Sequence, residues 1–108
     1  MKTATREQTG TTIVDVSGDI DMASSPGLRK TLLESLKKTP RLAVNMREVR
    51  YVDSSGVASL VEVLKEARTK QKRLVLFGLN TTVHEVLQLT RLTTIFEIRE
   101  TEEEALQA

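Results

Sequence analysis

The chain has 108 residues, of which 39% are hydrophobic and 29% charged; sixteen Lys and Arg against fifteen Asp and Glu leave a net charge of +1. This composition is that of a folded domain, and the balanced charge gives no electrostatic footprint for nucleic acid or an anionic membrane surface. Without Cys and with a single His, the chain excludes disulfides, thiol catalysis and thiolate or multi-histidine metal sites, so we expect no metal and no other cofactor.

No apolar run approaches the ~20 residues that span a bilayer, and the first residues lack the apolar core of a secretory signal. The sequence shows no internal repeat and no linker. We therefore expect a cytoplasmic protein in which residues 1–108 form a single domain, without direct membrane insertion and without a nucleic-acid partner.

The chain opens with two strand-like segments, residues 4–8 and 11–17. Thr9-Gly10 between them has the residue types that favour a turn. Together they predict a hairpin. Residues 18–21, Gly-Asp-Ile-Asp, follow as an expected loop.

The first predicted helix begins with Ser25 as N-cap and Pro26 at its first position, and it ends at Thr39-Pro40. Alternating apolar residues at 42, 44 and 46 then predict a third strand.

Residues 51–56 form an expected loop before the strongest helical pattern, which runs from Val57 to Ala67. A continuous apolar run at residues 74–77 predicts a central strand. The remaining expected elements are a helix with Thr82 and Glu85 at capping-box spacing, a strand at residues 95–98, and a helix at residues 101–108 that Thr101 and Glu104 would cap. The order is β-β-α-β-α-β-α-β-α, which predicts an α/β fold with a mixed sheet, because alternating strands and helices pair in parallel while the hairpin is antiparallel.

The segment Val52-Asp53-Ser54-Ser55-Gly56 places a carboxylate and two hydroxyls where the chain enters a helix. Ser and Asp are preferred N-caps, so helix capping alone explains the segment. The alternative is a regulated phosphoserine, because a phosphate at a helix N-terminus lies at the positive end of the dipole. On that interpretation phosphorylation leaves the domain folded and acts on a partner.

Small residues continue along the same helix, since Ser55, Ala58 and Ser59 lie opposite the apolar stripe. They predict either an exposed face that a partner approaches closely or an ordinary solvated face. Asp19 and Asp21 indicate a metal or partner surface, or simply a polar loop.

Taken together, these residues resemble the STAS domain family, whose founding members are bacterial anti-sigma factor antagonists. The resemblance covers nearly the whole chain and rests on the element order and on four segments: Gly18-Asp19-Ile20-Asp21, Tyr51-Val52-Asp53-Ser54-Ser55-Gly56, Arg73-Leu74-Val75-Leu76, and Leu89-Thr90-Arg91-Leu92 before Phe96. It implies a single-layer mixed sheet of about five strands with helices mainly on one face.

The resemblance also implies a non-enzymatic switch. The unphosphorylated protein would bind an anti-sigma factor serine kinase and free a sigma factor; phosphorylation of a serine would end the interaction, and a PP2C-type phosphatase would reset it. In the family pattern the acceptor is the first Ser after the Asp, here Ser54, and Asp53 would position its hydroxyl.

The same pattern assigns further residues to the partner-binding surface: Asp19, Asp21, Asp53, Ser54, Ser55, Gly56 and Ser59. Where many relatives carry Asp, this chain has Asn45, which implies one negative charge fewer near the site.

Other STAS domains are structural subunits of bacterial lipid-transport ABC systems, and this alternative would make transporter subunits the partners. The intact Asp-Ser-Ser-Gly segment favours the phosphorylation switch.

A serine hydrolase would need a G-x-S-x-G motif and a triad base, but the segment does not match that motif, and His84 is the single candidate base. A receiver domain would need a late Lys, but none follows Lys72.

Overall fold

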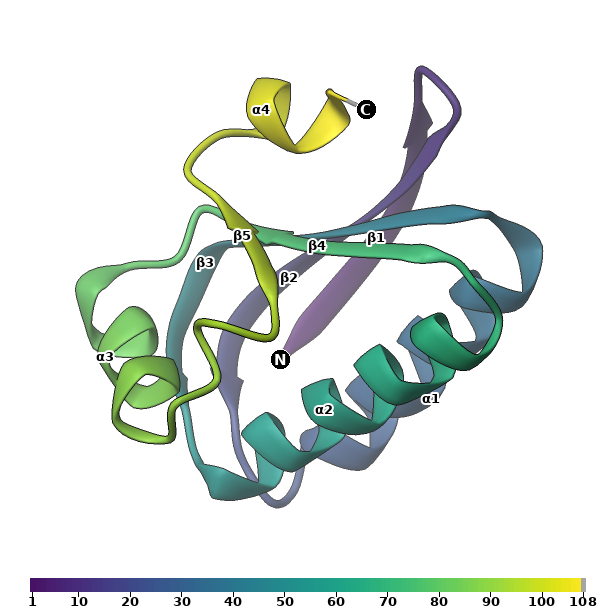
Figure 1. Cartoon of the computed structure of the whole chain (residues 1–108). Helices are drawn as coiled ribbons and strands as arrows, with labels where there is room; N and C mark the ends of the chain where they lie inside the picture. The colour runs from purple at the N-terminus through teal and green to yellow at the C-terminus, as the bar shows by residue number, and fades with distance from the viewer. Residues whose placement is uncertain (108) are drawn as a thin grey trace.

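The computed structural model describes residues 1–107 and is built on a five-stranded sheet with four helices packed against it (Figure 1). The elements in chain order are β1 Lys2–Gln8, β2 Thr11–Ile20, α1 Ser25–Lys38, β3 Arg41–Val52, α2 Ser54–Thr69, β4 Arg73–Phe77, α3 Thr81–Leu89, β5 Glu97–Arg99 and α4 Glu102–Leu106.

The strands lie side by side in sequence order, from β1 to β5. β1 pairs with β2 antiparallel, and every other neighbouring pair is parallel. The predicted order and the mixed sheet are therefore confirmed. Because the parallel strands all run the same way, α1 and α2 both begin at the edge of the sheet where β2 and β3 end.

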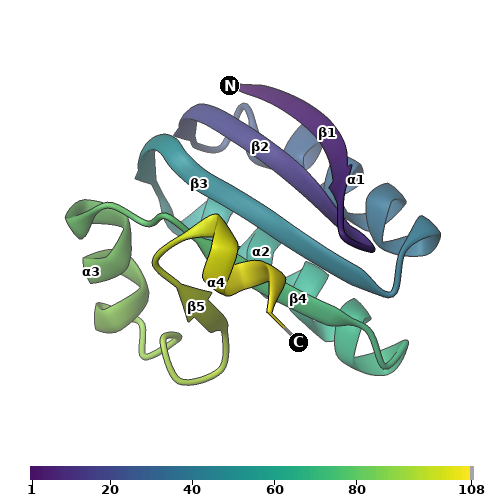
Figure 2. The same cartoon turned by 90° about the horizontal axis from the view of Figure 1, so that it is seen from above.

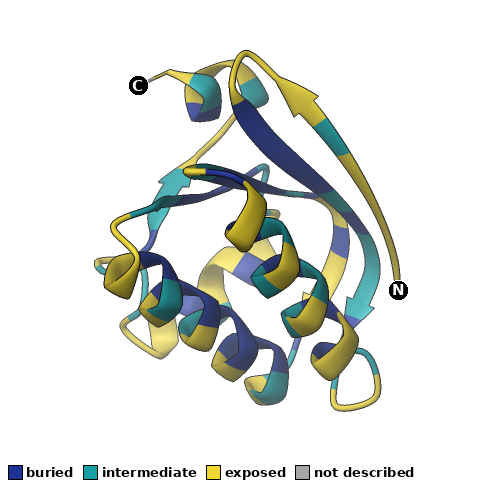
Figure 3. Cartoon of the chain, turned by 90° about the vertical axis from the view of Figure 1, so that its right-hand side faces the viewer, coloured by how far each residue is buried: buried dark blue, intermediate teal, exposed yellow. Residues whose placement is uncertain are grey.

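The main core lies between one face of the sheet and α1, α2 and α3, whose buried sides face the strands (Figure 3). Val14, Val44 and Leu76 line the sheet side of this core, and Leu32 and Leu60 enter it from α1 and α2. The short helix α4 lies on the opposite face (Figure 2). A smaller cluster fills the space under it: Ile13, Ala43, Val75, Phe77 and Ala105. Helices therefore lie mainly on one face, as expected.

Two strands are longer than their sequence pattern predicts. β2 continues through Ile20 and β3 through Val52, so Gly18-Asp19-Ile20 and Tyr51-Val52 are strand residues rather than loop. The register between β2 and β3 shifts twice, between Asp15 and Ser17 and again at Gly18. These irregularities break the alternation of side chains between the faces, which is why the period-2 pattern fades there.

Helix starts also differ from prediction in two places. α1 has Ser24, not Ser25, as its N-cap, and Ser25 is the buried first residue of the helix. α3 is capped by Asn80, whose side chain accepts a hydrogen bond from Val83 N at 2.8 Å. The predicted capping box that begins at Thr82 is therefore wrong. Thr101 caps α4 as predicted.

The C-terminal elements are shorter than expected. β5 covers Glu97–Arg99 instead of residues 95–98, and α4 ends at Leu106. Ala108, part of the predicted last helix, lies outside the described residues. Over residues 1–107 no helix combines the length and apolarity needed to cross a lipid bilayer.

An ion network ties the hairpin to α4 across the second face. Arg6 of β1 donates to both carboxylate oxygens of Asp15, at 2.8 and 3.1 Å, and also binds the carboxylate of Glu102. Asn45 adds a hydrogen bond to Asp15 Oδ1 at 2.8 Å. The hydrogen bonds from Arg6 are the main reason that the pKa values of Asp15 and Glu102 lie below their usual range.

We expect this network to make stability depend on pH. A carboxyl whose pKa is lower in the folded state stabilises the fold above its unfolded pKa, ~3.9 for Asp and ~4.3 for Glu. That contribution is lost as protonation sets in below about pH 5. Replacing Arg6 by Met should lower the free energy of unfolding at neutral pH by about 1 kcal/mol, since the pairs are partly exposed. In urea unfolding, the gap between wild type and variant should narrow toward about pH 3.

The matched control is Arg50→Met, which removes an ion pair to Asp19 in which the arginine is 77% exposed. Its loss should stay below about 0.5 kcal/mol. A gap for Arg6→Met that stays constant from neutral to acid pH would show that the carboxylates do not carry the effect.

Candidate functional site

The candidate site lies where β3 ends and α2 begins. Asp53 has extended backbone geometry, with φ −93° and ψ −175°, and is the N-cap of α2. Its Oδ1 accepts hydrogen bonds from Ser55 N at 2.9 Å, Gly56 N at 3.1 Å and the Ser55 hydroxyl at 2.5 Å. The expected capping function is therefore present, and it is performed by Asp53 rather than by either serine.

These contacts also fix the charge state of Asp53. The hydrogen bond from the Ser55 hydroxyl, followed by those from the backbone N–H groups of Gly56, Ser55 and Met22, holds the pKa of Asp53 below its usual range. Donors that favour the ionised form, together with the positive end of the α2 dipole, keep a negative charge at this position.

The two serines after Asp53 lie in different surroundings. Ser55 is half-buried; its hydroxyl donates to Asp53 and accepts a hydrogen bond from the Ser25 hydroxyl at 3.3 Å. Ser54 is exposed, and its hydroxyl makes no hydrogen bond within residues 1–107. Ser54 is thus the more accessible nucleophilic oxygen of the pair.

The end of β2 lies against the same site. Asp53 N donates to the carbonyl of Ile20 at 3.0 Å, and the backbone N–H of Met22 makes a small contribution to the lowered pKa of the Asp53 carboxyl. Ile20 and Val52 are register partners in adjacent strands. The fold therefore brings the Gly-Asp-Ile-Asp segment next to the Asp-Ser-Ser-Gly segment, thirty-odd residues later in the chain.

The two acidic residues of that segment are not free. The Asp21 carboxylate accepts from the backbone N–H groups of Ala23 and Ser24, each at 3.0 Å, and so shapes the turn before α1. Asp19 forms an exposed ion pair with Arg50 at 3.4 Å. Over the described residues, no three Asp, Glu or His side chains gather closely enough to hold a metal ion.

Gly56 sets how closely α2 approaches the sheet. It is buried, and a Cβ built on it would lie 2.6 Å from Ile20 Cγ2 and 2.8 Å from Val52 Cγ1. Any side chain would push the start of α2 away from the ends of β2 and β3. Gly56 therefore acts beneath the surface rather than on it.

Ser59 is also not a surface residue, and the prediction of an exposed small face is wrong there. It is 8% exposed. Ser55, one turn earlier, contacts Ser25 of α1, and Glu62, about one turn later, binds Arg29 of α1 at 2.6 Å. This side of α2 thus faces α1, and the small serines allow the two helices to approach each other.

Asn45 lies away from the site, contrary to expectation. It pairs with Asp15 and Phe77 in the middle of the sheet and hydrogen bonds to Asp15 beneath α4. Val52 lies seven positions further along β3, which places it roughly 20 Å away at ~3.3 Å per residue. An Asp at this position would repel Asp15, whereas the Asn amide donates to it.

Two apolar side chains next to the site escaped the sequence analysis. Met22 is 79% exposed in the turn before α1, and Tyr51 is 47% exposed, opposite Asp19 in the strand register. Their only sequence signal is an apolar residue within a polar stretch. Exposed apolar side chains of this kind offer contact area to a binding partner.

Comparison with known proteins gives consistent matches. The model of the STAS domain matches residues 2–105. The anti-sigma-B factor antagonist of Listeria monocytogenes is 34% identical over 90 residues, covering 82% of this chain and 79% of the relative.

Two solved structures share the fold. An anti-sigma factor antagonist from Mycobacterium paratuberculosis superposes with a TM-score of 0.89 at 24% identity, covering 97% of this chain and 90% of that one. The phosphorylated form of the Bacillus cell fate determinant SpoIIAA superposes with a TM-score of 0.73 at 20% identity, covering 97% and 96%.

The packing at Gly56 generates a paired prediction. Gly56→Ala should lower the free energy of unfolding by roughly 1–3 kcal/mol, because the added methyl overlaps the branched side chains of Ile20 and Val52. Gly27→Ala in α1 is the control: nothing lies within 4 Å of its Cβ, so helix propensity alone should stabilise by up to about 1 kcal/mol. Thermal and urea unfolding of both variants measure this. Equal stabilities would contradict the close approach of α2 to the sheet.

Proposed function

Because the chain belongs to the STAS domain family and, within it, to the anti-sigma factor antagonists, we propose that it is a phospho-regulated partner-switching protein with Ser54 as phosphoacceptor. Anti-sigma factor antagonists are non-enzymatic regulatory proteins, which agrees with the expectation of a protein that is not an enzyme. The observation that carries the proposal is the contrast between the two hydroxyls: that of Ser54 is exposed and unbonded within residues 1–107, whereas that of Ser55 is held by Asp53 and Ser25.

In the proposed cycle, the unphosphorylated protein binds an anti-sigma factor serine kinase in the cytoplasm and thereby frees a sigma factor. The kinase transfers phosphate to Ser54 and the complex dissociates; a PP2C-type phosphatase restores the starting state. Residues 1–108 act as one domain, and the protein needs neither a cofactor nor a metal of its own.

Phosphorylation would change the surface more than the fold. Ser54 is the first residue of α2, so a phosphate of about −1.5 to −2 charges meets the positive end of the helix dipole. The same phosphate adjoins ionised Asp53 and the Gly-Asp-Ile-Asp segment, which concentrates negative charge on one face. A partner that docks on this face when Ser54 is neutral must then desolvate or approach that charge.

The proposed partner-binding surface consists of the exposed groups around Ser54. Met22 and Tyr51 supply apolar contact area, Asp19 and Asp21 supply acidic groups at the rim, and Asp53, Ser55 and Gly56 shape the backbone beneath. Ser59 is left out because it is buried between α1 and α2.

Ser54→Asp tests the switch. We expect binding to the anti-sigma factor kinase to weaken by about tenfold or more, because the charge faces the partner, while the melting temperature stays within about 2 °C. Ser54→Ala is the control and should bind like wild type without accepting phosphate. Isothermal titration and scanning calorimetry measure both quantities. A Ser54→Asp protein that is unfolded, or that binds normally, would contradict the proposal.

Affinity purification from the source cells identifies the partner, with phosphopeptide mapping of residues 51–65. A kinase-fold protein together with phosphate on Ser54 supports the switch. Transporter ATPase and permease subunits, with neither Ser54 nor Ser55 phosphorylated, would instead support the lipid-transport role.

Met22 tests the position of the surface. Met22→Ala should weaken kinase binding by about tenfold, the usual effect of truncating an apolar anchor at the centre of an interface. Leu89→Ala is a control of matched exposure, because Leu89 is an 84% exposed apolar side chain on a different element, α3. Both variants should keep wild-type stability. Equal loss of binding in the two variants, or none in Met22→Ala, would place the interface elsewhere.

A further inference from the structure

The sheet has two free edges, and only one of them is long. β1 is an outermost strand of seven residues, whereas β5, at the other border, has three (Figure 2). All residues of β1 except Arg6 are exposed, and no segment of residues 1–107 pairs with its outer side. A long strand with one unpaired side is a template for a further strand.

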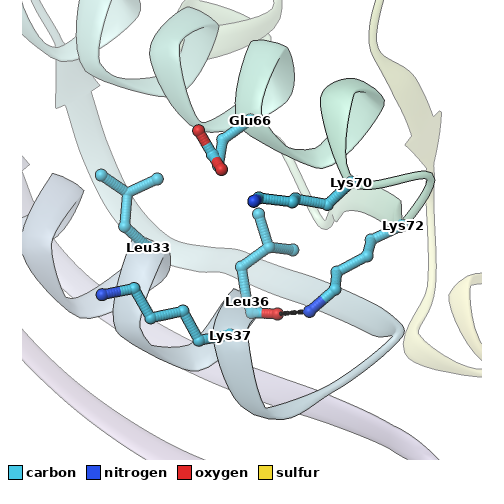
Figure 4. Close-up of a pocket in the computed structure, with 6 residues that line it drawn as sticks. All are labelled: Leu33, Leu36, Lys37, Glu66, Lys70 and Lys72. Carbon is cyan, nitrogen blue, oxygen red and sulfur yellow. Dashed lines mark hydrogen bonds between the residues drawn. The ribbon is translucent and has the colours of Figure 1, made fainter.

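Helix α1 does not close this edge. It packs against α2, β2 and β3, and its last turn is bound by Lys72, which directly precedes β4 and donates to the carbonyl of Leu36 (Figure 4). Between α1 and β1 a groove of about 320 Å³ remains, with Thr5 and Glu7 on the strand side and Thr31 on the helix side. An added strand would therefore lie along an open groove.

The hairpin turn determines which backbone groups of β1 point outward. Its two residues, Thr9-Gly10, have φ of 47° and 78°, the geometry of a type I′ turn, so Gln8 and Thr11 beside it form a hydrogen-bonded pair. Hydrogen-bonded pairs then alternate along β1, since its register with β2 has no shift. The N–H and C=O groups of three residues therefore point away from β2: Thr3, Thr5 and Glu7.

These free groups match a second copy of β1. Two identical strands related by a two-fold axis perpendicular to the sheet run antiparallel. With the axis at Thr5, that residue pairs with its own counterpart, and Thr3 of each copy pairs with Glu7 of the other. Each of these pairs exchanges both backbone hydrogen bonds. The sheets of the two copies would then be continuous, with both α1 helices on the same face.

Side-chain charges select this register. It places Lys2 opposite the uncharged Gln8, and Ala4 opposite Arg6. An axis one residue earlier would place Lys2 opposite Arg6, and an axis one residue later would place Arg6 opposite its own counterpart. Like charges directly opposite each other destabilise a strand pair. Of these three registers, the one centred on Thr5 alone avoids them.

Charged side chains commonly protect an edge strand from such pairing, but those of β1 protect it weakly. Arg6 is turned inward, because its guanidinium binds Asp15 and Glu102. The middle of the strand, Thr3-Ala4-Thr5, carries no charge, and threonine is favoured in strands. The part of the edge at the two-fold axis is therefore free to pair.

We propose that β1 is a self-association edge, through which two copies of this chain form a two-fold dimer centred on Thr5. One strand pair is a small contact beside the ~1,200–2,000 Å² of a standard interface, so the dimer is weak and forms at high concentration. The axis reverses the strand direction, which places the two Ser54 sites at opposite ends of the dimer. Both sites stay open to a partner, and dimerisation does not depend on the switch.

Sedimentation equilibrium of the purified full chain tests the dimer, together with backbone amide NMR shifts at the same concentrations. The range should extend from about 10 μM to about 1 mM, where weak association is measurable. We expect a monomer–dimer equilibrium, with concentration-dependent shifts centred on residues 3–7.

Two substitutions of the same kind test the register. Thr5→Lys places two ammonium groups opposite each other at the axis and should weaken dimerisation about threefold or more. Thr3→Lys places an ammonium group opposite Glu7 of the other copy, twice in each dimer, and should strengthen dimerisation by about the same factor. Both positions are exposed on the same face of β1, so circular dichroism should show an unchanged fold.

Three results would overturn the proposal. The first is a chain that stays monomeric up to about 1 mM; if residues 3–7 then shift in an extract of the source cells, the edge belongs to a different protein. The second is a dimer whose shifts lie outside β1. The third is a change in the same direction for both lysine variants. Because these measurements use the purified chain alone, they do not depend on whether a kinase binds at Ser54.

Discussion

The carboxylate of Asp53 holds together the part of the molecule on which its function depends. It accepts hydrogen bonds from the first turn of α2, and the Met22 N–H helps to lower its pKa, while the backbone N–H of Asp53 donates to Ile20 at the end of β2. A single side chain thus joins two strand ends, a turn and a helix start. These contacts also fix the position of Ser54, which is the first residue of α2 and is exposed.

Much of this site could be predicted from the sequence because its signals are local. The Asp-Ser-Ser-Gly segment is a helix start by residue type alone, and the apolar stripe around Leu60 identifies the buried side of α2. The hairpin and the order of elements follow from turn chemistry and periodicity. These signals predict each element and its immediate neighbours along the chain, but they do not predict how distant elements pack together.

The errors arose where long-range packing decides. Ser59 has the composition of an exposed residue, but the approach of α1 buries it. Gly18, with φ +96°, was predicted to belong to a loop, but it pairs with β3 and β2 continues through it. Asn45 was expected near the site through family resemblance, but the length of β3 carries it to the middle of the sheet. None of these three outcomes can be predicted from the ten or so residues around each position, because each depends on contacts with distant parts of the chain.

The network joining Arg6 to Glu102 has a consequence for the order in which the molecule assembles. Its partners are 96 residues apart, whereas Arg6 and Asp15 are nine apart. During synthesis the hairpin can form early, with Arg6 already bound to Asp15, but the second carboxylate partner, Glu102, leaves the ribosome only after β4 and β5. The second face of the sheet, with Phe77 and Val75, therefore stays uncovered until late. The nascent chain therefore exposes this apolar face for a time during synthesis. Chaperones that bind exposed apolar surface are able to bind it during that time.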